Sequence, residues 1–343
     1  MTQSDQLEGR RTFPPLTEGE SAGNSKVGCD RLAVSFQVRG FDPEPSSWSQ
    51  RSVRAAGEGQ IRTRSVMATD ALGRSAHVKV TETPFQAPDW AYVEANPARL
   101  LDPDGWSTAP LHRVSEALGV MLALACEVVL PDCDKSEVRV KRIDLARDFS
   151  GVESAGFYLR GLHGLARPYS RMNQLFVDPT GHNAQTLVVG SNVGKVRLYD
   201  KFVETSGKAP AGTLRWEVQA RGDWVVNAGL GTAGQLEPAV MESFAENRWE
   251  WSGMGTEVQA ANRVIEAVQR SGLSPREQRS FIGWLVMKSN GFEQEISAET
   301  QARYNRLVRQ LGITLGPKAL QDTGAAITGR LDWESGTEVL RVG

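Results

Sequence analysis

Residues 137–149 read EVRVKRIDLARDF, and this stretch does most to decide which fold the chain can form. Its apolar residues nearly alternate with polar ones, which is typical of a strand with one buried face; they are Val138, Val140, Ile143 and Leu145. Asp144 and Asp148 are four residues apart, so an extended strand places both carboxylates on the same face. We therefore expect a strand here that carries two acids on one side.

Other stretches repeat this alternation along the chain. They are CDRLAVSFQVRGF (29–41), IRTRSVMAT (61–69), SAHVKVTE (75–82), QTLVVGS (185–191), KVRLYDKFVE (195–204) and TLRWEVQAR (213–221). Between these stretches, apolar residues recur at helical spacing only over residues 111–130 and 156–166. Many strands with few intervening helices predict an α+β fold, built on an antiparallel β-sheet with flanking helices.

Changes in composition and apolar periodicity divide the chain into four parts. Residues 1–26 are polar and lack an apolar period, which predicts a flexible arm, and residues 27–235 hold the predicted sheet. Residues 236–321 read as helical, with helix starts at Ser274–Pro275 and Ser297. Residues 322–343 are expected to form a flexible tail.

The composition excludes several classes of protein. Lys and Arg number 39 against 41 Asp and Glu, so binding of nucleic acid would need a local basic surface, because the net charge is -2. The three cysteines form no CxxC pair, which argues against a disulfide framework or a structural zinc site. No long apolar run or signal peptide is visible. We expect a cytoplasmic protein without a membrane partner.

Acidic residues in the predicted strands are the first candidates for chemistry. Glu217 lies in TLRWEVQAR, and with Asp144 and Asp148 it gives three acids in sheet-rich surroundings. Such acids are costly to bury unless they are paired or bound to a cation. Oxygen ligands suit Mg²⁺ or Mn²⁺. The alternative is that the acids are structural and form salt bridges with their neighbours, which are Arg142, Arg147 and Arg215.

Tyr199 adds a hydroxyl to these candidates, and Arg197, Asp200 and Lys201 flank it in VRLYDK. A phenol with a pKa of about 10 is a poor nucleophile at neutral pH. A divalent cation on a phosphate, helped by Arg or Lys, would favour the phenolate. A lone tyrosine in a strand otherwise serves packing.

Five motifs occur in one order: CDRLAVSF, RIDLARDF, TLVVGS, VRLYDK and LRWEVQARG. Over about residues 27–230 the chain resembles the Rep_trans-type replication initiation factors of rolling-circle plasmids, filamentous phages and some integrative elements. Members of that family cut one strand at an origin and stay joined to the 5′ phosphate through a tyrosine, using a metal held by carboxylates. The scattered histidines, with no HxH pair, disfavour the histidine-based HUH mechanism. A tyrosine often found just before the GS dipeptide in the family is absent from TLVVGS.

The resemblance implies a role for each candidate residue. Tyr199 would be the nucleophile, and Asp144, Asp148 and Glu217 would hold Mg²⁺ or Mn²⁺. Arg197 and Lys201 would contact the phosphate. The residues expected to bind DNA are Arg142, Arg147, Arg215, Arg303, Arg306 and Arg309, the last three in the helical region that would recognise the origin. Tyr169 is the second choice of nucleophile.

The implied function is initiation of rolling-circle DNA replication by nicking and religating origin DNA. Its partners would be double- and single-stranded origin DNA. A host helicase and a second copy of the chain are further candidate partners. Three alternatives stay open: a conjugative relaxase of the same family, a non-enzymatic DNA-binding regulator, and a metal-dependent hydrolase that uses water.

Overall fold

The structure is a computed structural model, and it describes the greater part of the chain beyond residue 26. The described residues are 27–38, 48–54, 60–82, 89–103, 107–129, 137–152, 155–163, 166, 170–179, 184–255, 261–289, 296–313 and 327–342. The predicted N-terminal arm and Tyr169 lie outside them.

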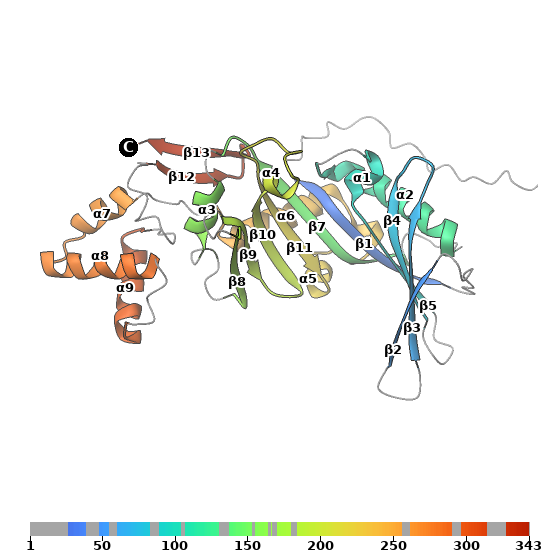
Figure 1. Ribbon diagram of the computed structural model, residues 1–343, viewed down its shortest axis with the longest axis horizontal. Coiled ribbons are helices and arrows are strands. Elements are labelled where there is room, and N and C mark those ends of the chain that lie inside the picture. The colour runs from blue at the N-terminus through green and yellow to red at the C-terminus, as the bar shows by residue number, and fades with distance from the viewer. Residues whose placement is uncertain are drawn as a thin grey trace, which may run out of the picture.

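One large antiparallel sheet dominates the molecule (Figure 1). From edge to edge its strands are β2 (Ser49–Arg54), β3 (Gln60–Thr69), β4 (Ser75–Glu82), β5 (Asp89–Ala95), β1 (Gly28–Val38), β7 (Arg139–Phe149), β11 (Leu214–Arg221), β10 (Gly194–Asp200), β9 (Ala184–Gly190) and β8 (Met172–Val177). The short strand β6 (Ala109–Pro110) pairs with β1. The α+β prediction is confirmed, and the stretch that suggested it forms β7 near the centre of the sheet.

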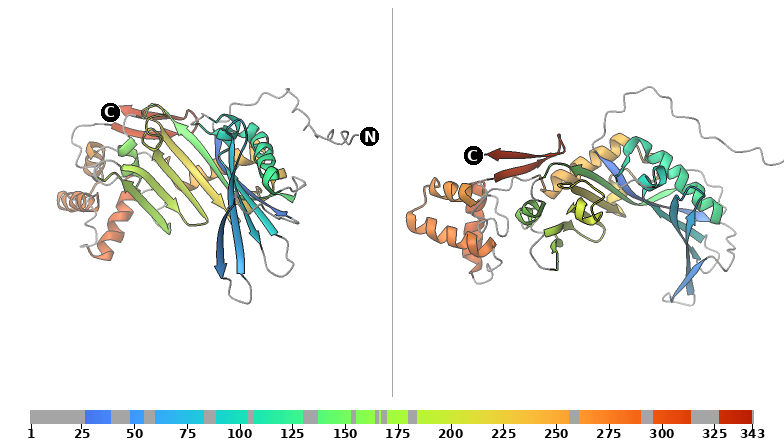
Figure 2. Two further views of the ribbon diagram at one scale, coloured as in Figure 1. Left: turned by 45° about the vertical axis from the view of Figure 1, so that its right-hand side comes forward. Right: turned by 45° about the horizontal axis from the view of Figure 1, so that its top comes forward.

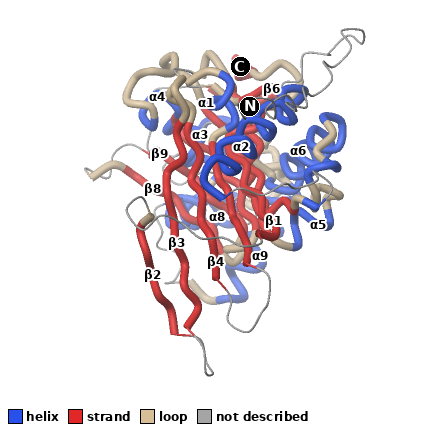
Figure 3. The backbone as a smooth tube through the Cα atoms, turned by 90° about the vertical axis from the view of Figure 1, so that its right-hand side faces the viewer, coloured by secondary structure: helices blue, strands red, loops and turns tan. Residues whose placement is uncertain are grey.

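Helices cover parts of the sheet. At one end, α1 (Pro97–Leu101), the short 3-10 helix at Leu111–Arg113 and α2 (Val114–Val129) follow β5 in the chain. Figure 3 shows α2 lying across β3 and β4. Toward the other end lie α3 (Ala155–Leu162), α4 (Lys201–Glu204) and α5 (Asp223–Asn227).

The central strands have one apolar face, and α6 (Pro238–Ser252) packs on it. Trp216 of β11 is fully buried, and its ring meets the Trp249 ring of α6 at a centroid distance of 6.0 Å. Phe149 of β7 stacks on the same Trp249 at 5.2 Å. Because side chains alternate along a strand, the neighbouring residues of β7 and β11 point to the opposite face.

The C-terminal residues return to this apolar face. We expected a flexible tail over 322–343, but β12 (Ile327–Asp332) and β13 (Thr337–Val342) form a hairpin. Trp333 at its turn meets Trp216 edge-on at 5.2 Å, and Thr337 bridges to Ser150 at the end of β7. The hairpin lies beside the sheet in both views of Figure 2.

A second, smaller core lies in the C-terminal helices. Phe281, Trp284 and Tyr304 pack there between α7 (Ala261–Gln269), α8 (Pro275–Ser289) and α9 (Ala298–Gln310), which form a separate cluster in Figure 1. Ser297 caps α9 as expected, accepting a hydrogen bond from the Thr300 amide at 3.3 Å. The helical region predicted for 236–321 is thus divided, because α6 belongs to the core of the sheet. None of the helices in the described ranges is both long and apolar enough to cross a membrane.

Candidate functional site

A layer of charged side chains lies on one face of β7, β11 and β10, and the pairing of these strands explains why they meet there. Asp148 is opposite Arg215, and Glu217 is opposite Arg197. Tyr199 is also opposite Arg215, on the other side of β11. Residues directly opposite each other point to the same face of a sheet. Most of the residues singled out in RIDLARDF, VRLYDK and LRWEVQARG therefore lie on this one face of the sheet. We call it the polar face; its residues are Arg142, Asp144, Asp148, Arg197, Tyr199, Arg215 and Glu217.

An arginine contacts each of the three acids predicted to bind metal. Arg142 donates to Asp144 from Nε at 2.8 Å, and Arg197 contacts both Glu217 oxygens at 2.6 and 2.7 Å. The third pair is between Arg215 and Asp148, with two contacts at 2.6 and 2.7 Å. The acids are salt-bridged, as the alternative had it, but the partner of Glu217 is Arg197, and Arg147 pairs with none of the three.

The carboxylates do not converge on one point where a cation would bind. Among the residues that the structure describes, no three of His, Cys, Asp or Glu form a group suited to hold a metal ion. The oxygen donors suit Mg²⁺ or Mn²⁺, but a cation bound by all three acids would have to replace their arginines. This arrangement does not fit a metal centre at Asp144, Asp148 and Glu217, and we derive no chemical step through one.

Tyr199 and Glu217 form a hydrogen-bonded pair in the middle of the polar face. The phenol donates to Glu217 Oε2 at 3.0 Å, and only 4% of Tyr199 is exposed. The Arg197 guanidinium lies 5.1 Å from the centre of the tyrosine ring, and Lys201 Nζ lies 5.6 Å from it. Two cations therefore flank a phenol that is already bound to a carboxylate.

The surroundings of this pair set its protonation. Burial, and then the charge of Glu217, raise the pKa of Tyr199 well above its ordinary value, so the phenol keeps its proton. Burial alone would raise the pKa of Glu217 too, but the charge and hydrogen bonds of Arg197, with further hydrogen bonds from Gln219 and Tyr199, hold it below its usual range. Glu217 is thus an ionised acceptor beside a protonated donor.

Asp30 is a member of the polar face that sequence reasoning missed. It is the extra residue of a β-bulge in β1, since Cys29 pairs with Leu145 and Arg31 with the adjacent Asp144. Bulges re-aim side chains next to functional sites. Here Asp30 accepts a hydrogen bond from Arg215 Nη1 at 3.0 Å. The signal in the sequence was an acid inside the apolar alternation of CDRLAVSF.

Mutual repulsion connects the acids of this layer. Burial raises the pKa of Asp144 to about 7 against the hydrogen bond from Arg142, and the charge of Glu217 adds to the rise. Burial and the charge of Glu217 also raise the pKa of Asp30. A proton on Asp144 near neutral pH would relieve the repulsion among these carboxyls.

Four predicted DNA contacts lie elsewhere. Arg147 is on the apolar face, is only 3% exposed, and lies 4.8 Å from the centre of the Trp333 ring. The other three are on the exposed side of α9: Arg303, which pairs with Glu277 at 2.7 Å, Arg306 and Arg309. Lys201 is brought to the polar face, where it pairs with Glu204 at 2.8 Å.

No family model matches the chain, and no curated protein matches its sequence. Among solved structures, it is similar to a rolling circle replication initiator protein from Geobacillus stearothermophilus, with 16% identity and a TM-score of 0.34, over 62% of this chain and 78% of that one. It is also similar to the di-domain ARO/CYC protein BexL of the BE-7585A biosynthetic pathway, with 11% identity and a TM-score of 0.19, over 66% and 96% of the two chains. TM-scores at this level do not establish a shared fold.

Proposed function

We propose that the chain initiates rolling-circle DNA replication by nicking one strand of origin DNA and later rejoining it, with Tyr199 as the nucleophile. The observation that carries the proposal is the Tyr199–Glu217 hydrogen bond of 3.0 Å between two flanking cations. A nucleophile that is bound to a proton acceptor and lies beside groups that stabilise negative charge has the elements of nucleophilic catalysis.

In the proposed step, Tyr199 Oη attacks a phosphodiester phosphorus and the bond from phosphorus to the 3′ oxygen breaks. The phenol proton passes to Glu217, and the leaving 3′ oxygen takes a proton from water. Because the pKa of Tyr199 is raised, the proton must leave as the new bond forms rather than before it. The phosphotyrosine bond conserves the energy of the broken bond, so the free 3′ hydroxyl can reverse the step without a nucleotide cofactor.

Arg197 connects substrate binding to this step. Its side chain is 32% exposed, yet it holds both oxygens of the fully buried Glu217. A DNA phosphate beside Tyr199 would compete for this guanidinium, since Arg binds phosphate and carboxylate in the same two-pronged way. Its transfer to the phosphate would stabilise the transition state and would free Glu217 to accept the proton.

The arginine pairing also supports a second candidate, a DNA-binding regulator without activity. A polar layer in which each acid has its own arginine is complete as a structural element and needs no reaction to explain it. The two candidates differ in whether Tyr199 reacts.

The deciding experiment compares wild type with Tyr199→Phe on supercoiled DNA that carries the origin. We expect nicked DNA and a covalent protein–DNA adduct from wild type, and neither from the variant. Tyr92→Phe is a matched control, because Tyr92 also donates to a glutamate of the same sheet, Glu94, at 2.8 Å. Nicking without an adduct would indicate a hydrolase that uses water, and binding without nicking would indicate the regulator.

A further inference from the structure

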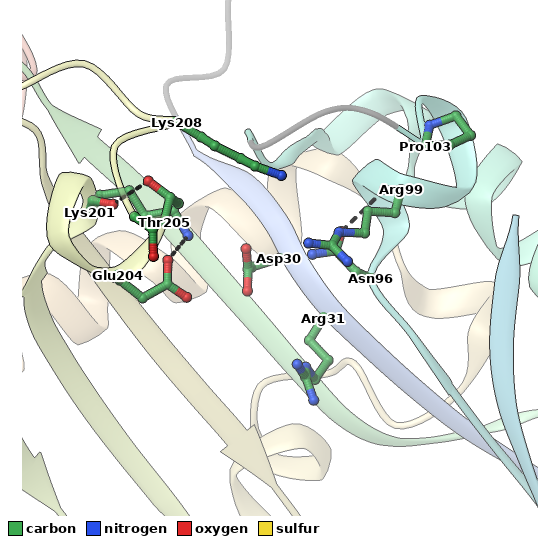
Figure 4. A pocket seen from close by; sticks show the side chains of 10 residues that line it. Asp30, Arg31, Asn96, Arg99, Pro103, Lys201, Glu204, Thr205 and Lys208 are labelled. Atoms are coloured by element: carbon green, nitrogen blue, oxygen red, sulfur yellow. Dashed lines mark hydrogen bonds and ion pairs between the residues drawn. The ribbon is translucent and has the colours of Figure 1, made fainter. Parts of the chain in front are cut away.

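A cleft opens beside the polar face, between the start of β1, helix α1 and the segment that follows α4 (Figure 4). Its volume of about 620 Å³ is within the range of roughly 300–1,000 Å³ that small-molecule sites have. Four cations line it, against two acids, Asp30 and Glu204; the cations are Arg31, Arg99, Lys201 and Lys208. A concave surface with an excess of positive charge favours an anion.

Arg99 and Lys208 are the two cations that make the cleft a candidate binding site. They come from opposite walls, and in Figure 4 both extend over the start of β1 toward one another. Within the described ranges, no salt bridge joins either of them to a carboxylate, whereas Arg31 pairs with Glu94 and Lys201 with Glu204. Both side chains are exposed, so an anion that enters the cleft can reach both of them.

The cleft adjoins the polar face, because two of its lining residues are neighbours of Tyr199 or of Arg215. Lys201 lines the cleft, is only 5% exposed, and its Nζ lies 5.6 Å from the centre of the Tyr199 ring. Asp30, also in the lining, is bonded to Arg215, the residue opposite Tyr199 in the sheet. An anionic chain bound in the cleft would therefore continue toward the tyrosine.

We propose that this cleft binds the phosphate backbone of single-stranded DNA next to the cleaved bond, with Arg99 and Lys208 as its phosphate contacts. The inference rests on the proposed function, because it is the reaction at Tyr199 that calls for a strand leading into the polar face. Arg99 and Lys208 are binding residues in this account and do not touch the reacting atoms.

The test measures binding of a dT oligonucleotide of roughly 16 nucleotides, the upper end of single-strand site sizes, by fluorescence anisotropy over a series of salt concentrations. Each phosphate contact contributes about 0.7 to the slope of log K against log salt for single strands. We expect the double variant R99Q/K208Q to lower the magnitude of this slope by about 1.4. The control K79Q/R113Q, which also removes one Lys and one Arg outside the cleft, should leave the slope unchanged.

An unchanged slope in R99Q/K208Q would overturn the proposal. If the slope is unchanged but the variant loses binding of inorganic phosphate, the cleft binds a free anion and not DNA, and the proposal is again overturned. The adduct assay on the same wild-type protein separates the two claims. A changed slope without an adduct upholds the cleft and rejects the nicking reaction; an adduct with an unchanged slope does the reverse.

Discussion

Replacing Arg215 by methionine tests whether arginines hold the polar face together. Arg215 is fully buried and makes two contacts to Asp148, at 2.6 and 2.7 Å, and one to Asp30, at 3.0 Å. Methionine keeps much of the side-chain volume but leaves both carboxylates without their guanidinium. The variant therefore isolates the loss of charge pairing from the loss of packing.

The size of the effect follows from how far the two acids remain solvated. Removing one partner of a buried ion pair costs about 3–5 kcal/mol of unfolding free energy. The side chain of Asp148 is 30% exposed and that of Asp30 is 17% exposed, so water can partly solvate the acids that lose their partner. We expect a loss near the lower end, about 3 kcal/mol.

Urea unfolding followed by tryptophan fluorescence measures this loss, and Trp216 adjoins Arg215 in β11. Arg113→Met is the control, because Arg113 forms an exposed pair with Glu116, with 42% and 53% of the side chains exposed. Such surface pairs contribute about 0–1 kcal/mol. If Arg215→Met cost no more than Arg113→Met, the polar face would not depend on its arginines and the reasoning would be refuted.

The pKa of Asp144 is raised to about 7, above an unfolded value of about 3.9, so the unfolding free energy of wild type should fall as pH rises between these values. Asp144→Asn should remove this pH dependence. Equal pH slopes for the two proteins in urea unfolding would contradict the prediction. Because an arginine holds each of the three acids, Mn²⁺ should raise the Tm of wild type no more than that of Glu217→Gln; a rise in Tm for wild type alone would show that Glu217 binds the metal. Trp333→Ala should lower the unfolding free energy by about 3 kcal/mol, at the low end for a large aromatic, because Trp333 is only partly buried. It should also speed proteolysis of the β12–β13 hairpin. Unchanged proteolysis would show that the hairpin is not docked.

Alternation in the sequence was sufficient to predict the central strands and one face of the site. Asp144 and Asp148 share a face of β7 as their spacing of four requires. The same rule places Arg147, five residues from Arg142, on the other face, because an odd separation reverses the direction of a side chain in a strand. The expectation of DNA binding by Arg147 followed the motif instead of this parity.

Other features depend on long-range contacts that local patterns do not encode. Asp30 reaches Arg215 only because a bulge forms where β1 meets β7, and the bulge is a property of the pairing. Residues 327–342 have little apolar periodicity of their own, but Trp333 finds a place against Trp216 once the sheet exists. The register between β7, β11 and β10 likewise decides the pairs Arg215–Asp148 and Arg197–Glu217, whereas Arg142 and Asp144 are two residues apart in β7.

The most direct test of the central claim is to identify the residue that becomes joined to DNA. Wild-type protein is incubated with single-stranded DNA from the element that carries its gene, denatured, digested, and analysed by mass spectrometry. The account predicts a 5′-phosphonucleotide on the peptide that contains Tyr199, and none in Tyr199→Phe. A nucleotide attached to any other tyrosine, or cleaved DNA with no attached peptide, would contradict it.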